Sequence, residues 1–155
     1  MLFKIETVID RDIFAVYDFL TNLERLPWQT HPFVKEYTKM TGGSFNVGAR
    51  YKETFIYRKW KIEIITEVIN YDKPTKIEYS WTGKQMKGTL KYNLKETNNK
   101  TFIRQTQTLF LAGFLKMFNP IIYIIFRKRI TERLESIKFL LDNKMEGIKS
   151  FAELI

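Results

Sequence analysis

Apolar and polar residues alternate repeatedly through the first two-thirds of the chain, whereas the last third has a helical period. Alternation with a period of two is typical of strands that bury one face. Short runs containing glycine, proline, asparagine or aspartate separate these segments and predict tight turns. The pattern predicts about seven strands, at Leu2–Ile9, Phe33–Lys39, Arg50–Tyr57, Trp60–Tyr71, Lys76–Trp81, Met86–Leu94 and Thr101–Leu111.

Two short helices are predicted after the first strand. Asp10 and Asp12 are candidate N-caps, because a carboxylate oxygen can accept from an unpaired helix N–H. The helix they begin extends through Leu20, with one apolar face made of Ile13, Val16, Tyr17 and Leu20. Residues 22–32 contain two prolines and are interpreted as a second short helix or a turn.

A long amphipathic helix is predicted to begin at Asn119-Pro120. Asparagine is a favoured N-cap, and proline is well tolerated at the first helical position. A helix of roughly 23 residues is about 34 Å long, enough to cross a whole sheet. Its apolar stripe consists of Ile122, Phe126, Ile130, Leu134, Ile137 and Leu141.

The predicted fold class is α+β. Tight turns between consecutive strands require an antiparallel sheet, because parallel strands need crossover connections. The length of 155 residues favours a single domain over residues 1–155. A long helix over one sheet tends to enclose a space, which is where a function is expected.

Composition excludes several kinds of chemistry. The chain has no cysteine and one histidine, His31, so thiol catalysis and histidine-rich metal centres are excluded, and no metal or cofactor is expected. The apolar stretch Leu109–Phe126 is interrupted by Gly113, Lys116, Asn119 and Pro120, so a bilayer span is not expected. No secretory signal is evident, and a cytoplasmic location is expected.

The charge leaves several partners open. The net charge of +9 attracts anions, and aromatic residues make up 15% of the chain. Nucleic acid is ranked last as a partner, because basic residues are spread over the chain and no nucleic-acid-binding motif is present.

Four segments carry a resemblance to a known superfamily: IDRDIFAVYDFLTNLERLPWQTHPFVKE, VGARYKETF, TEVINYDKPTKIEYSW and FLKMFNPIIYIIFRKRITERLESIKFLLDN. Together they resemble the START-like, or Bet v 1-like, superfamily (SRPBCC type), which includes polyketide cyclase/dehydrase and lipid-transport proteins. The resemblance covers nearly the whole chain. It implies a helix-grip fold, in which a curved sheet wraps a long C-terminal helix around a cavity for a hydrophobic ligand. It does not identify the ligand.

Alternation also predicts which residues face that cavity. Tyr79 and Trp81 should point inward with Ile77, and in the last strand we favour the face with Gln105 and Gln107, because it keeps Arg104 out of the interior. The candidate ligand-binding residues are Trp28, Phe33, Tyr51, Phe55, Tyr79, Trp81, Met86, Leu90, Gln105, Gln107, Ile122, Phe126 and Ile130.

Several of these residues have an ordinary structural interpretation as well. Large aromatic side chains usually fill core volume, and the two glutamines can satisfy each other in an internal network. Glu53 shares a face with Tyr51 and Phe55: buried, it would have a raised pKa and could act as an acid or base, whereas near the sheet edge it would be solvated. His31 is interpreted as structural or solvent-facing. No catalytic residue is predicted.

An empty hollow of roughly 300 Å³ would cost about 7 kcal/mol, so a cavity of that size should be filled by side chains, water or ligand. Residues 109–118 form either ordinary core or a mobile lip through which an apolar ligand enters. Nearby Lys116, Arg127, Lys128 and Arg129 would allow transient contact of this lip with an anionic membrane.

The leading functional hypothesis is binding or transport of a hydrophobic small molecule, such as a lipid, isoprenoid or polyketide-like compound. The alternative is a polyketide cyclase/dehydrase-like enzyme acting in the same cavity, because such sites work largely by shaping and desolvating the substrate.

Overall fold

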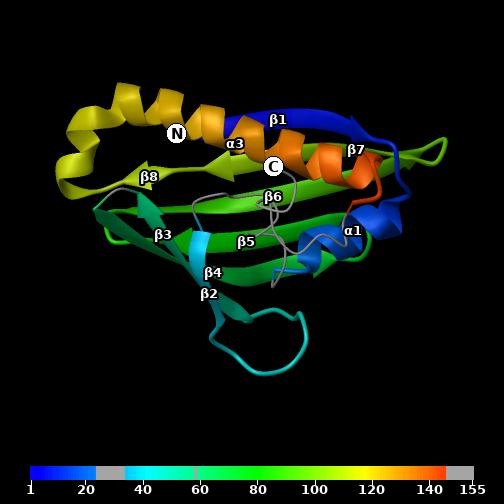
Figure 1. Cartoon of the computed structure of the whole chain (residues 1–155), viewed down its shortest axis with the longest axis horizontal. Helices are drawn as coiled ribbons and strands as arrows, with labels where there is room; N and C mark the ends of the chain where they lie inside the picture. The colour runs from blue at the N-terminus through cyan, green and yellow to red at the C-terminus, as the bar shows by residue number, and fades with distance from the viewer. Residues whose placement is uncertain (24–33, 58, 146–155) are drawn as a thin grey trace.

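One long helix packs along the inner face of a curved antiparallel sheet (Figure 1). The computed structural model describes residues 1–23, 34–57 and 59–145. Its strands are β1 (Leu2–Ile9), β2 (Val34–Lys39), β3 (Arg50–Tyr57), β4 (Trp60–Asp72), β5 (Lys76–Thr82), β6 (Met86–Thr97), β7 (Lys100–Thr108) and β8 (Phe110–Leu111). Its helices are α1 (Ile13–Thr21), the 3₁₀ helix η1 (Gly113–Phe118) and α3 (Asn119–Asp142). The predicted α+β helix-grip fold is confirmed.

Every pair of neighbouring strands is antiparallel, in the order β1-β7-β6-β5-β4-β3-β2, with β8 paired to β6. The first strand, β1, therefore pairs with β7, which is one of the last strands in the sequence. The registers shift between Val34 and Glu36 in β2 and between Val68 and Asn70 in β4. Irregularities of this kind increase local twist and bend a strand, which gives the sheet its curvature.

The face assignments made from alternation are confirmed in the central strands. Ile77, Tyr79 and Trp81 of β5 are all buried, as are Leu90 and Tyr92 of β6. In β7 the favoured inner face is also the buried one, since Ile103 is fully buried and Gln105 is 2% exposed. Arg104, on the other face, is exposed and its Nε donates to Glu6 Oε1 at 2.5 Å.

The early helix α1 begins as predicted at Asp12, whose side chain accepts from the Ala15 N–H at 2.9 Å. Its predicted apolar face is buried under the sheet's inner side, together with Phe19. The second short helix predicted from the sequence, together with Trp28, His31 and Phe33, lies outside the described residues.

The predicted N-cap of the long helix is wrong. Asn119 already has helical dihedrals, φ −43° and ψ −49°, and the flanking residue is Phe118, which makes no side-chain cap. The reason is that η1 runs directly into α3, so the chain does not enter the helix from an extended residue that could present a capping side chain. Pro120 occupies the first turn, as predicted.

The apolar stripe of α3 is buried only in its second half. The buried residues are Ile130, Leu134, Ile137, Leu140 and Leu141. Ile122 and Phe126 are partly buried against the core, and none of the α3 residues that precede Ile130 is fully buried. The C-terminal half of α3 therefore supplies most of the helix's contribution to the core.

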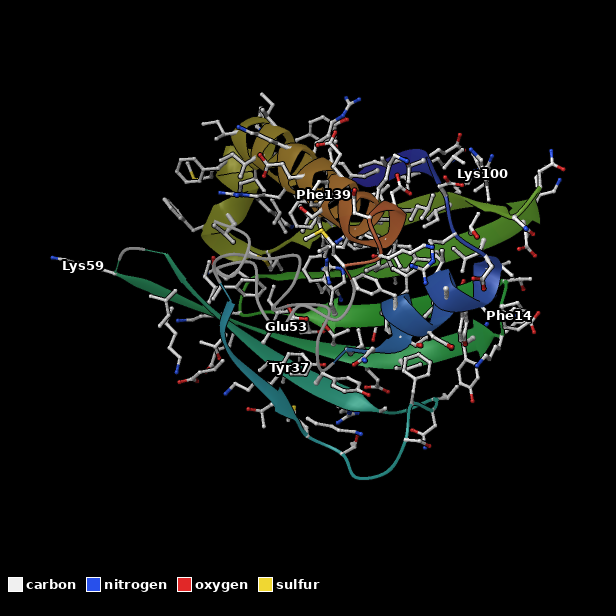
Figure 2. All side chains as sticks on the ribbon, turned by 45° about the vertical axis from the view of Figure 1, so that its right-hand side comes forward. Phe14, Tyr37, Glu53, Lys59, Lys100 and Phe139 are labelled. Atoms are coloured by element: carbon white, nitrogen blue, oxygen red, sulfur yellow. The ribbon has the colours of Figure 1, made fainter. Side chains whose placement is uncertain are left out.

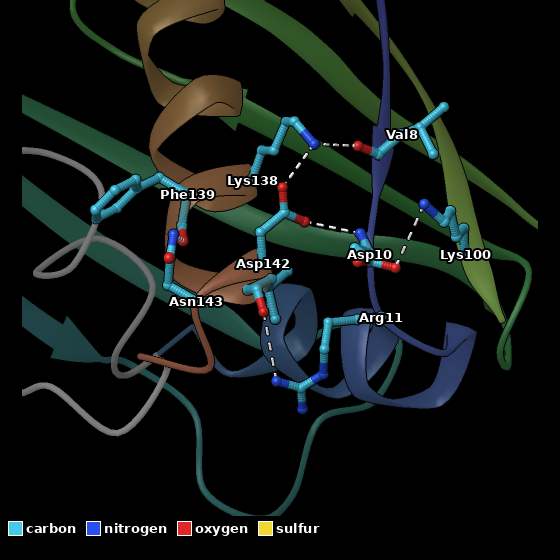
Figure 3. A network of polar contacts seen from close by, with 9 residues as sticks. Val8, Asp10, Arg11, Lys100, Lys138, Phe139, Asp142 and Asn143 are labelled. Atoms are coloured by element: carbon cyan, nitrogen blue, oxygen red, sulfur yellow. Dashed lines mark hydrogen bonds and ion pairs between the residues drawn. The ribbon is translucent and has the colours of Figure 1, made fainter.

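A network of polar contacts holds that C-terminal half to the beginning of the chain (Figure 3). Lys138 Nζ donates to the Val8 carbonyl at 2.5 Å and pairs with Asp142 at 2.6 Å. Asp142 Oδ1 accepts from the Asp10 N–H at 2.7 Å, and Arg11 donates to the Leu141 carbonyl at 3.4 Å. These contacts join α3 to the end of β1 and to the residues that precede α1.

The last predicted strand is divided into β7 and β8 beside Gly88. A Cβ at Gly88 would lie 2.0 Å from the Thr108 carbonyl oxygen and 2.7 Å from Trp81 Cζ2, so only glycine fits. Thr108 Oγ1 accepts from the Thr89 N–H at 2.8 Å in place of a regular backbone bond. The predicted strand Thr101–Leu111 is thus divided at Leu109, although β8 keeps the register that β7 has against β6.

The segment of residues 109–118 also divides. Leu109 and Leu111 are buried in the core, whereas Phe110, Phe114 and Met117 are exposed. In the described part of the chain, none of the helices has the length and apolarity that a bilayer span needs.

Candidate ligand cavity

A cavity of about 120 Å³ lies between the inner face of the sheet and α3. Strands β3 to β7 line it on one side and α3 lines it on the other, and the cavity is partly open to solvent. Its lining consists of Leu23, Glu53, Phe55, Ile64, Thr66, Tyr79, Trp81, Leu90, Tyr92, Gln107, Phe126, Arg129, Ile130 and Arg133.

The structure brings together many of the residues predicted to bind a ligand. Those on the lining are Phe55, Tyr79, Trp81, Leu90, Gln107, Phe126 and Ile130. Tyr51, Met86, Gln105 and Ile122 lie in or against the surrounding core and outside the lining. Trp28 and Phe33 lie outside the described residues.

Sequence reasoning missed Arg129 and Arg133, which line the cavity from α3. Both fall beside the apolar stripe, and the periodicity assigns them to the helix's charged face. A signal was present, since Arg129 follows Phe126 and Arg133 follows Ile130 by three residues, which places both arginines beside residues of the apolar stripe.

An aromatic wall connects the cavity with the outer surface of α3. The Trp81 and Phe126 rings stack at 5.8 Å between centroids, and Phe126 lies 5.4 Å from Phe3. Phe3 stacks in turn on Tyr123 at 5.0 Å. Tyr123 is 36% exposed, so the row of four rings runs from solvent to the cavity lining.

One part of the cavity is polar. Glu53 of β3 is only 7% exposed, and Figure 2 shows it on the strand among the side chains of the interior. The Trp81 indole N–H, the Tyr92 hydroxyl and the Arg133 Nε–H are buried, with no hydrogen-bond partner among the described residues. Buried polar groups are normally paired. Three donors and a carboxyl therefore border the same small space.

Burial raises the pKa of Glu53, and the positive charge of Arg133 opposes that rise. Desolvation disfavours the carboxylate more than Arg133 stabilises it, so the protonated form of Glu53 persists above the usual pH range. Burial also raises the pKa values of Tyr79 and Tyr92. Both phenols stay neutral, and Tyr79 Oη donates to the Leu20 carbonyl at 3.1 Å.

The two glutamines of β7 bond to each other, but the expected internal network is incomplete, because the buried Gln105 Oε1 has no hydrogen-bond partner among the described residues. Gln105 Nε2 donates to Gln107 Oε1 at 3.2 Å. Gln105 lies behind the lining, whereas Gln107 is on it. Gln107 is therefore the member of this pair that can contact a bound molecule.

The cavity is smaller than the roughly 300 Å³ at the lower end of ligand pockets. Its volume of about 120 Å³ corresponds to about four waters at roughly 30 Å³ each, and is close to the roughly 150 Å³ of an apolar cavity that takes benzene. Left empty, it would cost about 3 kcal/mol at roughly 24 cal/mol per Å³. The protein can tolerate that cost, unlike the larger void considered from the sequence.

Among the residues that the structure describes, no group of His, Cys, Asp or Glu side chains is arranged to hold a metal ion. The polar groups that line the cavity are carboxyl, guanidinium, phenol, indole, hydroxyl and amide groups.

Neither a known protein-family model nor a curated protein matches the sequence. Solved structures do match the fold. TTHA0849 from Thermus thermophilus has a TM-score of 0.75 at 14% identity, with 91% of this chain and 97% of that chain covered. Ara h 8.0201 has a TM-score of 0.71 at 13% identity, with 91% and 97% covered.

A further match is norcoclaurine synthase from Thalictrum flavum, solved in complex with dopamine and hydroxybenzaldehyde. Its TM-score is 0.69 at 13% identity, with 90% of this chain and 85% of that chain covered. The Bet v 1-like, START-like resemblance expected from the sequence is confirmed as a shared fold. Identities this low establish the fold alone.

Proposed function

We propose that this chain, as a single START-like domain over residues 1–155, binds or transports a hydrophobic small molecule in the cavity between the sheet and α3. The observation that carries the proposal is a cavity with aromatic and aliphatic walls and with buried donors at Trp81, Tyr92 and Arg133 that have no partner among the described residues. Such a site favours a ligand with an apolar body and one polar end, which would accept from these donors. A lipid, an isoprenoid and a polyketide-like compound all meet this description.

The cavity volume limits what enters without a conformational change. About 120 Å³ accommodates roughly one ring or a short branch of a chain. A larger ligand requires the N-terminal third of α3 to move away from the sheet. That movement is favoured by the absence of fully buried residues in α3 before Ile130.

Binding of phenol and benzene tests the proposal, because the two differ only in a polar group. Phenol should bind more tightly, and both should perturb NMR signals of Trp81, Tyr92 and Ile130. Ile130→Trp, which fills the cavity, should abolish binding. Ile124→Trp on the exposed face of the same helix should not, since Ile124 is 68% exposed. Binding unaffected by Ile130→Trp in a folded variant would overturn the proposal.

Native mass spectrometry of the purified protein gives a second test. A bound apolar compound should add mass that disappears after denaturation or extraction with an organic solvent. If no compound co-purifies and neither phenol nor benzene binds, the cavity is a packing defect or a water site.

The alternative proposal is a cyclase/dehydrase-like enzyme, and it rests on Glu53. A buried carboxyl with a raised pKa in a desolvated cavity is suited to proton transfer. Glu53→Gln distinguishes the two functions once a ligand is identified by mass spectrometry. An enzyme should lose turnover of that compound by about 100-fold or more while binding is retained, whereas a carrier shows no turnover in either form.

Two further expectations from the sequence are part of this proposal. They are a cytoplasmic location and transient contact with an anionic membrane. Nucleic acid is not proposed as a partner.

A further inference from the structure

A patch of exposed apolar side chains covers the end of the molecule where β8, η1 and the beginning of α3 meet, drawn in yellow in Figure 1. We call it the apolar patch; it consists of Phe110, Phe114, Met117, Ile121, Ile124 and Ile125. Met117 is 76% exposed and Phe114 is 62% exposed. The Phe114 ring packs on Phe118 at 4.9 Å, so part of the patch is organised at the surface.

These side chains do not contribute to the core. Residues 121–126 are apolar or aromatic without interruption, yet none of them is fully buried. Single exposed apolar residues are ordinary, whereas six of them on adjoining segments are typical of a surface that another body covers. The patch therefore needs an occupant.

The charged residues in and next to the segments that form the patch, from residue 110 to residue 129, are all basic. No Asp or Glu occurs between Glu96 and Glu132. Four basic side chains are exposed around the patch: Lys84, Lys87, Lys116 and Arg127. Among the described residues, no carboxylate lies within ion-pair distance of any of them. Lys87 pairs with Phe110 across β6 and β8, so its charge lies beside the patch.

The acidic residues that follow mark where the basic region ends. Glu132 lies 3.8 Å from Lys128 Nζ and 3.3 Å from Arg129 Nη1. The charges of Lys128 and Arg129 are thus partly compensated, unlike those nearer the patch. A second copy of this chain is a poor occupant, because face-to-face pairing would bring two basic rims together. An anionic lipid surface fits both the apolar centre and the basic rim.

We propose that the apolar patch docks the protein on anionic membranes, with its apolar side chains inserted among the lipids and its cations near the headgroups. η1 and the first turns of α3 would lie in the interface and not cross it. In this mode the apolar side chains enter the membrane only to a shallow depth. Short segments such as η1 and the exposed part of α3 are long enough for that.

The patch lies directly behind one wall of the cavity. Tyr123, next to Ile124 of the patch, stacks on Phe3, and Phe3 contacts Phe126, which stacks on Trp81 of the lining. Docking would place this aromatic wall against the bilayer, so an apolar molecule could pass between membrane and cavity without crossing water. The docking locates the membrane contact that is part of the proposed function, and this last step rests in addition on the proposed ligand binding.

Co-sedimentation of the full chain with vesicles tests the docking. Neutral phosphatidylcholine vesicles are compared with vesicles containing about 30% phosphatidylserine at about 0.1 M salt. The wild type should bind the anionic vesicles, and binding should weaken steeply as salt is raised. Phe114→Ser should reduce binding by about tenfold or more, because an inserted phenyl ring is removed.

Matched controls lie elsewhere on the surface. Phe139→Ser, on the C-terminal half of α3, and Phe14→Ser, on α1, remove phenyl rings of similar exposure and should leave binding unchanged (Figure 2). Lys116→Gln and Arg127→Gln should each lower binding about fivefold. Lys95→Gln should not, since it is nine residues along β6 from Met86, which pairs with β8.

Three results would overturn the docking. One is no binding to anionic vesicles, and another is equal loss in patch and control variants, which would mean non-specific charge attraction. The third is a dimer in solution that Phe114→Ser dissociates, which would identify a second copy as the occupant. If the protein binds vesicles but neither phenol nor benzene, the docking stands and the ligand proposal fails. If it binds phenol or benzene but no vesicles, the ligand proposal stands and the docking fails.

Discussion

At the scale of single residues, Glu53 is where the interior departs most from an ordinary core. It is buried on β3, and burial raises its pKa against the opposing charge of Arg133. The folded protein therefore binds this proton more tightly than the unfolded chain does. The stability contribution of Glu53 is complete below the ordinary value of 4.5 and is lost as pH rises through the raised folded pKa.

Glu53→Gln imitates the protonated carboxyl and removes this pH dependence. The variant should match the wild type in free energy of unfolding near pH 4 and exceed it near pH 8. Urea denaturation at the two pH values measures the difference. Glu135→Gln on the exposed side of α3 serves as the control and should follow the wild type at both. A Glu53→Gln variant less stable than wild type near pH 8 would contradict the assignment.

Gly88 decides how closely β6, the β7–β8 junction and Trp81 approach. Gly88→Ala would force its Cβ against the Thr108 carbonyl and the Trp81 ring. We expect a loss of about 3 kcal/mol or more in the free energy of unfolding, since backbone atoms must move. Trp81 fluorescence should shift as well, because the ring is displaced toward the cavity. Gly42→Ala, with open space at its Cβ, is the control.

At the scale of elements, α3 has two parts with different surroundings. From Ile130 onward its apolar residues are buried and its polar residues are tied to β1 and to the residues before α1. Before Ile130 it covers the cavity with Ile122 and Phe126 only partly buried, and it presents isoleucines to solvent. The helix is therefore anchored at one end and lightly packed at the end nearest the apolar patch.

Matched alanine substitutions on α3 measure this difference. Ile137→Ala, at a fully buried position, should cost about 2–5 kcal/mol. Ile124→Ala, at a largely exposed position, should change stability by less than about 0.5 kcal/mol. Both values come from urea denaturation of the full chain. Similar losses at the two positions would mean that α3 is embedded evenly along its length.

At the scale of the whole molecule, a ligand that binds only the folded state must raise its stability. Phenol at ten times its Kd should add about 1.4 kcal/mol. For a domain of this size that corresponds to an increase of about 3–6 °C in Tm. Ile130→Trp should remove the increase while Ile124→Trp retains it. An equal increase in both variants would place phenol outside the cavity.

Local periodicity was enough to predict most of the fold. The strands follow the alternation closely, and the inner faces of β5, β6 and β7 follow from it because a strand's side-chain period is two. Tyr79, Trp81, Leu90 and Gln107 could be assigned to the cavity for the same reason. The acid-free run between Glu96 and Glu132 is likewise a property of the sequence alone.

Tertiary structure alone decided the rest, because those features depend on residues far apart in the chain. Alternation placed Glu53 on a face with Tyr51 and Phe55, but only packing against α3, some 80 residues later, determined that this position is buried and faces Arg133. The helical period placed Ile122 and Phe126 toward the sheet, but only the structure shows that both are no more than partly buried. The size of the cavity is set by how closely helix and sheet approach, which no local pattern encodes.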